Sequence, residues 1–181
     1  PWVASSRVGY EIADPSYWTG GSCPAGRRCR YSDSAFVRFD GGVSYSRGRV
    51  ARTTGLGSLT ISSVYPDFRI NSEAAYPLKG EVLNKMGRTT GWSQGTVSRT
   101  CFTTNVTGTN ITLLCQDAVT AATSQGDSGS PVFKIVSSPN RIRLYGILWG
   151  GNGTEFAFSR FSQIQRELGT LATCDPALGG C

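Results

Sequence analysis

Residues 126–131 read Gly-Asp-Ser-Gly-Ser-Pro and contain the residue types that nucleophilic catalysis by a serine requires. The small residues around Ser128 leave its hydroxyl accessible, and the flanking glycines permit a tight, strained turn. In such a turn the backbone N–H groups of Gly126 and Ser128 can point at one spot, where the negative charge of an oxyanion would develop. The stretch therefore indicates acyl transfer with Ser128 as the nucleophile.

The general base for this reaction has no obvious candidate in the sequence. A serine hydroxyl is a weak nucleophile unless a base lies within hydrogen-bond reach, and imidazole is the usual base because its pKa lies near neutrality. The 181 residues contain no histidine. The motif for the nucleophile is thus present without its proton acceptor.

The composition predicts an all-β protein. Only 17% of the residues are charged, glycine occurs 23 times, and β-branched and aromatic residues are spread along the chain, which favours many short strands joined by turns. The expected strands are 8–12, 34–39, 47–54, 59–64, 81–86, 96–101, 111–115, 132–136, 144–149 and 155–158, with 65–80 as a connection.

One helix is expected, near the C-terminal end. Phe161, Ile164, Leu168 and Leu171 follow helical spacing and form one apolar stripe. Ser159 or Ser162 is expected to cap the start of the helix. Gly169 is expected to end it early.

The six cysteines favour disulfides over a metal site. Six cysteines allow fifteen connectivities, and pairing between sequence neighbours is the simplest of them. With no Cys-x-x-Cys motif and no histidine, a zinc site is disfavoured, so no metal is expected. Disulfides imply an oxidising compartment and therefore a secreted, extracellular protein. The expected pairs are Cys23–Cys29, Cys101–Cys115 and Cys174–Cys181.

The net charge of +6 does not by itself indicate a nucleic-acid partner. The arginines are scattered, and no basic–aromatic interleaving or binding motif accompanies them, so a solvated basic face is the preferred interpretation. No apolar stretch is long enough to span a membrane. Pro1 is not a translation start, so we expect a processed or truncated chain.

Four segments together resemble the chymotrypsin-like serine proteases, in particular secreted bacterial members. Residues 126–131 resemble the nucleophile loop, 85–92 a segment early in the second barrel, 31–37 the stretch with the buried catalytic aspartate, and 146–150 the strand lining the substrate cleft. They occur in the family's order, and with the terminal helix they cover the chain from about Val8 to Leu171.

The resemblance implies two antiparallel six-stranded β-barrels with the site in the cleft between them, followed by a C-terminal helix. On this basis residues 1–70 form an N-terminal barrel, incomplete in this chain, 71–160 a C-terminal barrel, and 161–181 the helix and tail. The implied activity is that of a secreted endopeptidase that cleaves polypeptides through an acyl-enzyme. No cofactor is implied.

The resemblance also implies roles for individual residues. Ser128 is the nucleophile, Asp33 is the carboxylate that orients the histidine, and the N–H groups of Gly126 and Ser128 form the oxyanion hole. Asp127 is a buried acid that needs a cationic partner, and Lys85 matches the position of that partner, so an Asp127–Lys85 ion pair is expected.

The main substrate pocket is expected to be formed by residues just before the nucleophile and by the cleft strand. None of these residues is acidic, so a preference for an apolar or small side chain is favoured. Glu155 is a further candidate from the neighbouring strand, although a surface role is preferred for it. The substrate-binding residues implied are Ala122, Thr123, Ser124, Gln125, Trp149 and Gly150.

The sequence departs from the family in its lack of histidine. The family's histidine precedes the aspartate, so we expect it on an upstream segment, with this chain alone almost inactive. Open strand edges in the incomplete barrel would favour association with that segment or with a second chain. The alternative is a catalytically inactive homologue that uses the cleft to bind proteins or peptides.

Overall fold

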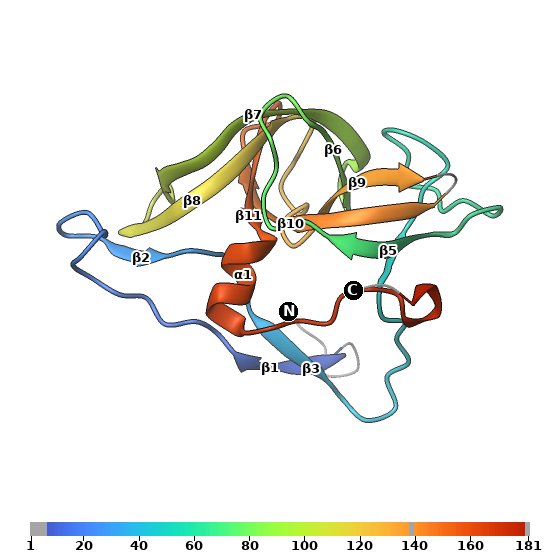
Figure 1. The fold of residues 1–181 in the computed structure, drawn as a ribbon, viewed down its shortest axis with the longest axis horizontal. Coiled ribbons are helices and arrows are strands. Elements are labelled where there is room, and N and C mark those ends of the chain that lie inside the picture. The colour runs from blue at the N-terminus through green and yellow to red at the C-terminus, as the bar shows by residue number, and fades with distance from the viewer. Residues whose placement is uncertain (1–6, 138–139, 180–181) are drawn as a thin grey trace.

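The computed structural model describes residues 7–137 and 140–179. Its main body is a closed six-stranded antiparallel barrel. The hydrogen-bonded order is β11-β8-β7-β6-β9-β10, and pairing of β10 with β11 closes the ring (Figure 1). The barrel strands are β6 (Val82–Gly87), β7 (Gly91–Asn105), β8 (Ile111–Thr120), β9 (Pro131–Ser137), β10 (Arg141–Gly151) and β11 (Phe156–Arg160).

Alternating apolar residues fill the barrel. Successive side chains in a strand point to opposite faces, so every second residue can face the interior. Phe156 and Phe158 in β11 follow this rule and are fully buried. Leu83, Val97 and Val119 come from three other strands and belong to the same apolar cluster. The expected hairpin of the strands over 96–101 and 111–115 is confirmed as β7–β8, but both strands are longer, and residues 96–99 lie opposite 118–120.

Three further strands extend the sheet. β4 (Arg49–Ala51) pairs with β5 (Asp67–Glu73), β5 runs parallel to β10, and β2 (Arg28–Arg30) runs parallel to β8. The expectation that 65–80 is a connection is therefore wrong for β5. Phe68 and Ile70 alternate with less buried polar residues, so this half-buried strand resembles a polar linker in sequence.

The expected strand over 59–64 is also wrong. In this region only Ile61 forms an isolated bridge, to Thr53. Leu59, Ile61 and Val64 are exposed, so no buried face is available to hold the segment in a sheet.

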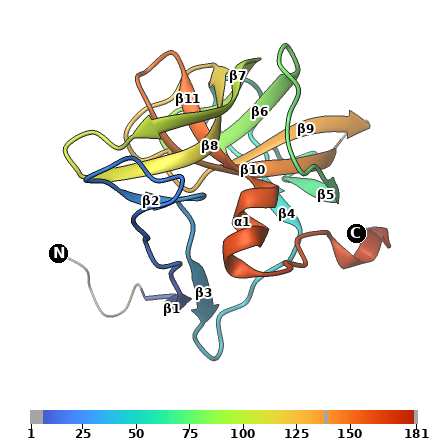
Figure 2. The ribbon, with the colours of Figure 1, turned by 60° about the vertical axis from the view of Figure 1, so that its left-hand side comes forward.

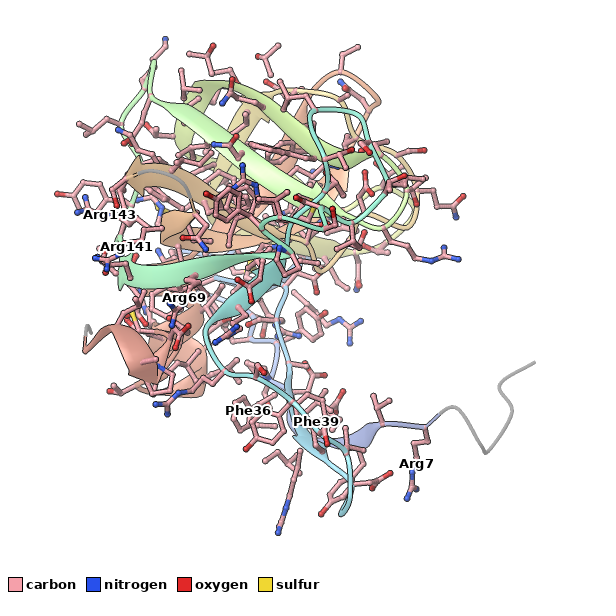
Figure 3. The ribbon with its side chains drawn as sticks, turned by 90° about the vertical axis from the view of Figure 1, so that its right-hand side faces the viewer. Arg7, Phe36, Phe39, Arg69, Arg141 and Arg143 are labelled. Atoms are coloured by element: carbon pink, nitrogen blue, oxygen red, sulfur yellow. A yellow bond between two sulfur atoms is a disulfide. The ribbon has the colours of Figure 1, made fainter. Side chains whose placement is uncertain are left out.

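β1 (Gly9–Ala13) and β3 (Phe36–Phe39) form a separate two-stranded antiparallel sheet. Figure 2 shows this sheet set apart from the barrel, on the side where helix α1 lies. Figure 3 shows Phe36 and Phe39 lying away from the barrel, and both side chains are largely exposed. The described residues thus contain one closed barrel, and they do not show a second.

The expected helix is confirmed as α1 (Phe161–Leu168). Phe161 and Ile164 are buried, and the N–H of Gly169 closes the C-terminus on the carbonyl of Gln165. The N-cap is Arg160, without a side-chain hydrogen bond, so the expected serine cap is wrong. Leu171 lies beyond the helix and still packs against the core. A short 3₁₀ turn, η2 (Pro176–Leu178), follows.

Two expected disulfides are present, Cys23–Cys29 and Cys101–Cys115. The first lies in the apolar cluster with Leu114 at the outer end of β8. The third expected pair includes Cys181, which lies outside the described residues. Among the helices of the described segments, none is long and apolar enough to cross a membrane.

Candidate active site

Ser128 lies in an exposed turn between β8 and β9. Its Oγ donates to the carbonyl of Trp149 at 3.3 Å. The turn is attached to β10 by two backbone hydrogen bonds, from Gly129 N to Leu148 O at 2.8 Å and from Leu148 N to Ser130 O at 2.9 Å. Gly126 has φ of 95°, in the region where glycine is favoured, which agrees with the strained turn expected from the sequence.

Two backbone donors in this turn have no partner in the described part of the chain. Neither the N–H of Gly126 nor that of Ser128 donates a hydrogen bond to a residue in 7–137 or 140–179. Both donors belong to an exposed turn next to the Ser128 hydroxyl. They are therefore available to an oxygen atom of a ligand.

Asp127 anchors the turn from inside the barrel. Its Oδ2 lies 3.0 Å from Nζ of Lys85, and both side chains are fully buried, so the expected ion pair is confirmed. The carboxylate also accepts hydrogen bonds from Thr89 N, Thr90 N, Ser124 N and Thr90 Oγ1, at 2.8, 3.1, 3.1 and 2.6 Å. The ammonium donates to Gly91 O at 3.1 Å and also to Thr90 Oγ1.

These contacts decide the protonation state of Asp127. Burial alone would raise the pKa of its carboxyl, but hydrogen bonds from Thr90, Lys85 and Thr89 outweigh burial and hold the pKa far below its ordinary value. The space around the pair is tight, because a Cβ at Gly87 would lie 2.3 Å from Asp127 Oδ1. Gly87 is thus part of the site, and the interpretation of the sequence did not identify it.

Asp33 is held by residues from the C-terminal part of the chain. Its backbone N–H donates to Ser159 Oγ at 2.9 Å. Glu167 on α1 accepts hydrogen bonds from Tyr31 N at 2.7 Å and from Ser32 N at 2.8 Å. The Asp33 loop is therefore docked on the end of β11 and on the terminal helix.

The carboxylate of Asp33 accepts no hydrogen bond from any described residue. Desolvation raises the pKa of this carboxyl, and the positive charge of Arg30 acts in the opposite direction. Arg30 itself is buried, and its guanidinium is directed to Asp14 at 2.8 Å and to Ser34 O at 2.6 Å. Asp33 thus retains acceptor capacity for a further donor.

A 410 Å³ cavity adjoins Ser128 and contains four of the expected substrate-binding residues, Thr123, Ser124, Gln125 and Gly150. Its other lining residues are Leu148, Gly151, Asn152 and Gly153, so no charged side chain of the described residues lines it. Two expected residues do not line it. The carbonyl of Ala122 accepts from Ser93 Oγ at 2.8 Å, and Trp149 contributes its carbonyl to Ser128.

Glu155 does not line this cavity. Its carboxylate accepts from Ser98 Oγ at 2.7 Å and pairs with Arg99 at 2.5 Å, both on β7. The preferred interpretation of Glu155 as a residue outside the pocket agrees with this arrangement.

The asparagine at position 152 shapes the rim of the cavity through its own loop. Asn152 Oδ1 accepts from the backbone N–H groups of Thr154 at 3.1 Å and Glu155 at 2.9 Å. This turn places Gly153 where its carbonyl accepts from Thr123 N at 3.2 Å. The Asn152 side chain thus holds its own loop, and one backbone hydrogen bond joins that loop to Thr123.

No protein-family model matches this chain. No curated protein matches it either. Solved structures do match. Thermobifida fusca protease A has a TM-score of 0.59 at 21% identity, with 91% of this chain and 78% of that chain covered. The chymotrypsin of Cellulomonas bogoriensis has a TM-score of 0.59 at 22% identity, with 93% and 82% covered.

A third match is a serine protease specific for glutamic acid, described as using a histidine triad in substrate binding. Its TM-score is 0.60 at 22% identity, with 90% of this chain and 72% of that chain covered. At such identities the likeness concerns the fold. This chain is therefore all-β and shares the fold of bacterial chymotrypsin-like serine proteases.

Proposed function

We propose that this chain carries the nucleophile of a secreted serine endopeptidase, which hydrolyses peptide bonds through an acyl-enzyme on Ser128. The observation that carries the proposal is the exposed Ser128 hydroxyl at the edge of a cavity, beside two N–H groups that donate to no residue the structure describes. Such donors stabilise an oxyanion because they are already oriented before the charge develops. The fold shared with serine proteases agrees with this assignment.

The base of the reaction is a histidine on a segment that precedes these residues. The Asp33 carboxylate, with no hydrogen-bond donor among the described residues, is suited to accept the N–H of that imidazole. The chain matches 72–82% of the length of the three neighbours described above.

The exposed β1–β3 sheet supports the same proposal. Isolated two-stranded sheets are marginally stable in water, and open strand edges pair readily with other strands. Tyr10, Phe36 and Phe39 are exposed to 47%, 45% and 43%. Strands of the upstream segment would cover them and complete an N-terminal barrel around β1 and β3, within residues 1–70. Beside it lie a C-terminal barrel over 71–160, whose sheet β2 and β4 extend, and the helix and tail of 161–181.

The chemistry follows from these positions. Ser128 Oγ leaves the Trp149 carbonyl and attacks the substrate carbonyl carbon, while the imidazole takes its proton. The N–H groups of Gly126 and Ser128 hold the resulting oxyanion. The intermediate collapses, the C–N bond breaks, and the leaving amine takes the proton from the imidazolium. Water, deprotonated by the same imidazole, then attacks the acyl carbon. The second intermediate collapses with cleavage of the bond to Ser128 Oγ, the imidazolium returns the proton to this oxygen, and the acid is released.

The cavity favours a neutral substrate side chain. A charged side chain would lose hydration there and find no opposite charge among the lining residues. Asp127 lies behind the turn, but its charge is already neutralised by Lys85. The cavity thus favours apolar or small uncharged side chains over acidic or basic ones.

The test is covalent labelling with a fluorophosphonate. The complete gene product, with the residues upstream of Pro1, should become labelled at Ser128 as identified by peptide mass spectrometry, and Ser128→Ala should abolish the label. The 181-residue chain alone should react more slowly by at least about 10³-fold, because it lacks the base.

The alternative is an inactive homologue that binds proteins or peptides in the cleft, and it is favoured by the absence of histidine from these 181 residues. It predicts that the folded complete product remains unlabelled while still binding peptides. An upstream sequence without any histidine would also overturn the endopeptidase proposal.

A further inference from the structure

Gln116 lies on β8 and is fully buried. It contacts both the Asp33 loop and β10, the strand that contributes to the cavity beside Ser128. Its Oε1 accepts hydrogen bonds from Trp149 Nε1 and Ser159 Oγ, each at 2.9 Å. Its Nε2 donates to the carbonyls of Tyr31 and Leu114, each at 2.8 Å. One side-chain amide therefore uses two donors and two acceptor sites, which is its full capacity.

The orientation of this amide is set by its partners. The indole N–H of Trp149 can only donate, and the carbonyls of Tyr31 and Leu114 can only accept. Rotating the amide by half a turn would place Nε2 opposite the Trp149 N–H and Oε1 opposite the two carbonyls. Three of the four hydrogen bonds would then be lost. Gln116 thus has a single arrangement that satisfies all its neighbours.

A continuous path of hydrogen bonds runs through Gln116. The Asp33 N–H donates to Ser159 Oγ, that hydroxyl donates to Gln116 Oε1, and the same oxygen accepts from the Trp149 indole. The backbone carbonyl of Trp149 accepts a hydrogen bond from Ser128 Oγ. The path joins the loop of the expected catalytic carboxylate to the strand that contacts the expected nucleophile.

We propose that Gln116 is a positioning residue, which sets the place of Asp33 relative to Trp149 and hence to Ser128. The effect of Gln116 on the position of Asp33 is inferred from the hydrogen-bond path alone. Its effect on catalysis rests in addition on the proposed function. Displacements of about 1 Å in such a site can lower the rate by about 10²-fold. Successive hydrogen bonds in a buried chain, such as Asp33 N–H to Ser159 Oγ and Ser159 Oγ to Gln116 Oε1, also polarise and strengthen one another.

The structural part is tested by amide hydrogen exchange on the complete gene product. Trp149→Phe keeps an aromatic ring and removes the indole donor, with a reduction in size that the Trp92→Phe control shares. It should accelerate exchange of the Asp33 amide by about fivefold or more, the factor expected for loss of one hydrogen bond. Trp92→Phe is the matched control, because Trp92 Nε1 donates to a different buried amide, Asn84, at 2.8 Å. It should leave the Asp33 amide unchanged.

The catalytic part is tested by peptide hydrolysis. Ser159→Ala removes the hydroxyl that links Gln116 to the Asp33 loop. It should lower kcat by about tenfold with little change in KM, because it leaves the bond between Gln116 and the Trp149 indole in place. Gln116→Met removes all four hydrogen bonds and should lower kcat and raise KM together. Gln116→Glu retains both acceptor contacts and should bring KM part of the way back to the wild-type value, since the bond from the Trp149 indole is kept.

The outcomes separate the two proposals. If Trp149→Phe leaves the Asp33 amide at its wild-type exchange rate, the proposal for Gln116 is wrong. If Gln116→Met and Ser159→Ala lower only the melting temperature, as Trp92→Phe should, the positioning role is also wrong. If Asp33 responds to Trp149→Phe but the wild-type protein does not react with a fluorophosphonate, the coupling stands and the endopeptidase proposal fails.

Discussion

Lys85 and Asp127 form an ion pair with 3.0 Å between Nζ and Oδ2, and both side chains are completely buried. Two charges withdrawn from water require compensation by hydrogen bonds as well as by each other. Thr90 supplies part of it, because its hydroxyl contacts both the carboxylate and the ammonium. Asp127, the residue next to Ser128, is therefore fixed by a small cluster of buried polar groups.

Removal of the cation should be strongly destabilising. Lys85→Met would leave the Asp127 carboxylate buried without its counter-ion, and we expect a loss of about 3–5 kcal/mol in the free energy of unfolding. Urea denaturation measures this loss. We also expect slower labelling of Ser128 in the complete product, since the turn that presents its N–H group would shift.

A second lysine–carboxylate pair provides the control. Lys134 lies 2.7 Å from Glu81, but its side chain is 42% exposed. Lys134→Met should change the free energy of unfolding by only about 0–1 kcal/mol. Equal losses in the two variants would contradict the importance given to the buried pair.

Low pH should lower the free energy of unfolding, because the Asp127 carboxylate becomes protonated. Because the folded state lowers the pKa of this carboxyl far below its ordinary value of 3.8, the unfolded chain takes up the proton first as the pH falls. The stabilisation is therefore fully present above about pH 5 and is lost progressively at lower pH. Melting temperatures measured across this range report the loss.

Asp127→Asn isolates this contribution from those of other carboxylates. The variant should be less stable at neutral pH and should depend less on pH in the acid range. An acid dependence identical to that of the wild-type protein would show that another group is responsible.

Gly87 should not tolerate a side chain. The Cβ of an alanine there would lie 2.3 Å from Asp127 Oδ1 and 2.9 Å from Lys85 Nζ. Gly87→Ala should therefore lower the free energy of unfolding by about 1–3 kcal/mol, as overpacking does. Gly55→Ala is the matched control, because its Cβ would meet no heavy atom within 4 Å. Denaturation curves in which both variants match the wild-type protein would refute this account.

Gly150 should control the size of the accepted side chain. It lines the 410 Å³ cavity, and a Cβ at this position would meet no heavy atom within 4 Å. Gly150→Val should therefore fold normally and occupy part of the cavity. We expect kcat/KM of the complete product for peptides with a large apolar side chain to fall by at least about tenfold, and that for alanine peptides to fall less. A uniform fall across peptides would place the binding site elsewhere.

Much of the local structure was predictable because short-range interactions determine it. The apolar stripe of Phe161 and Ile164 with Gly169 behind it specifies a helix and its end, and α1 has those limits. The glycines at 126 and 129 allow the turn that exposes Ser128, and both have positive φ. Expectations based on the family resemblance also led to Lys85 as the partner of Asp127.

The strands that depend on distant partners were harder to predict. β5 is a strand because Phe68 and Ile70 pack into the core and its backbone pairs with β4 and β10, on segments well separated in the sequence. The apolar residues over 59–64 find no such partner and remain exposed. Local sequence patterns do not distinguish these two segments, because the difference lies in whether distant parts of the chain supply a pairing strand and an apolar surface.

The hydrogen bonds that connect distant residues of the site could be identified only from the tertiary structure. The sequence by itself identified the nucleophile turn, because its function depends on residues adjacent in the chain. Gln116 gave no signal, because its contacts come from Tyr31, Trp149 and Ser159, which closure of the barrel and docking of the loop bring to one amide. A hydrogen bond depends on the positions of both partners, and for distant residues only the folded chain determines those positions.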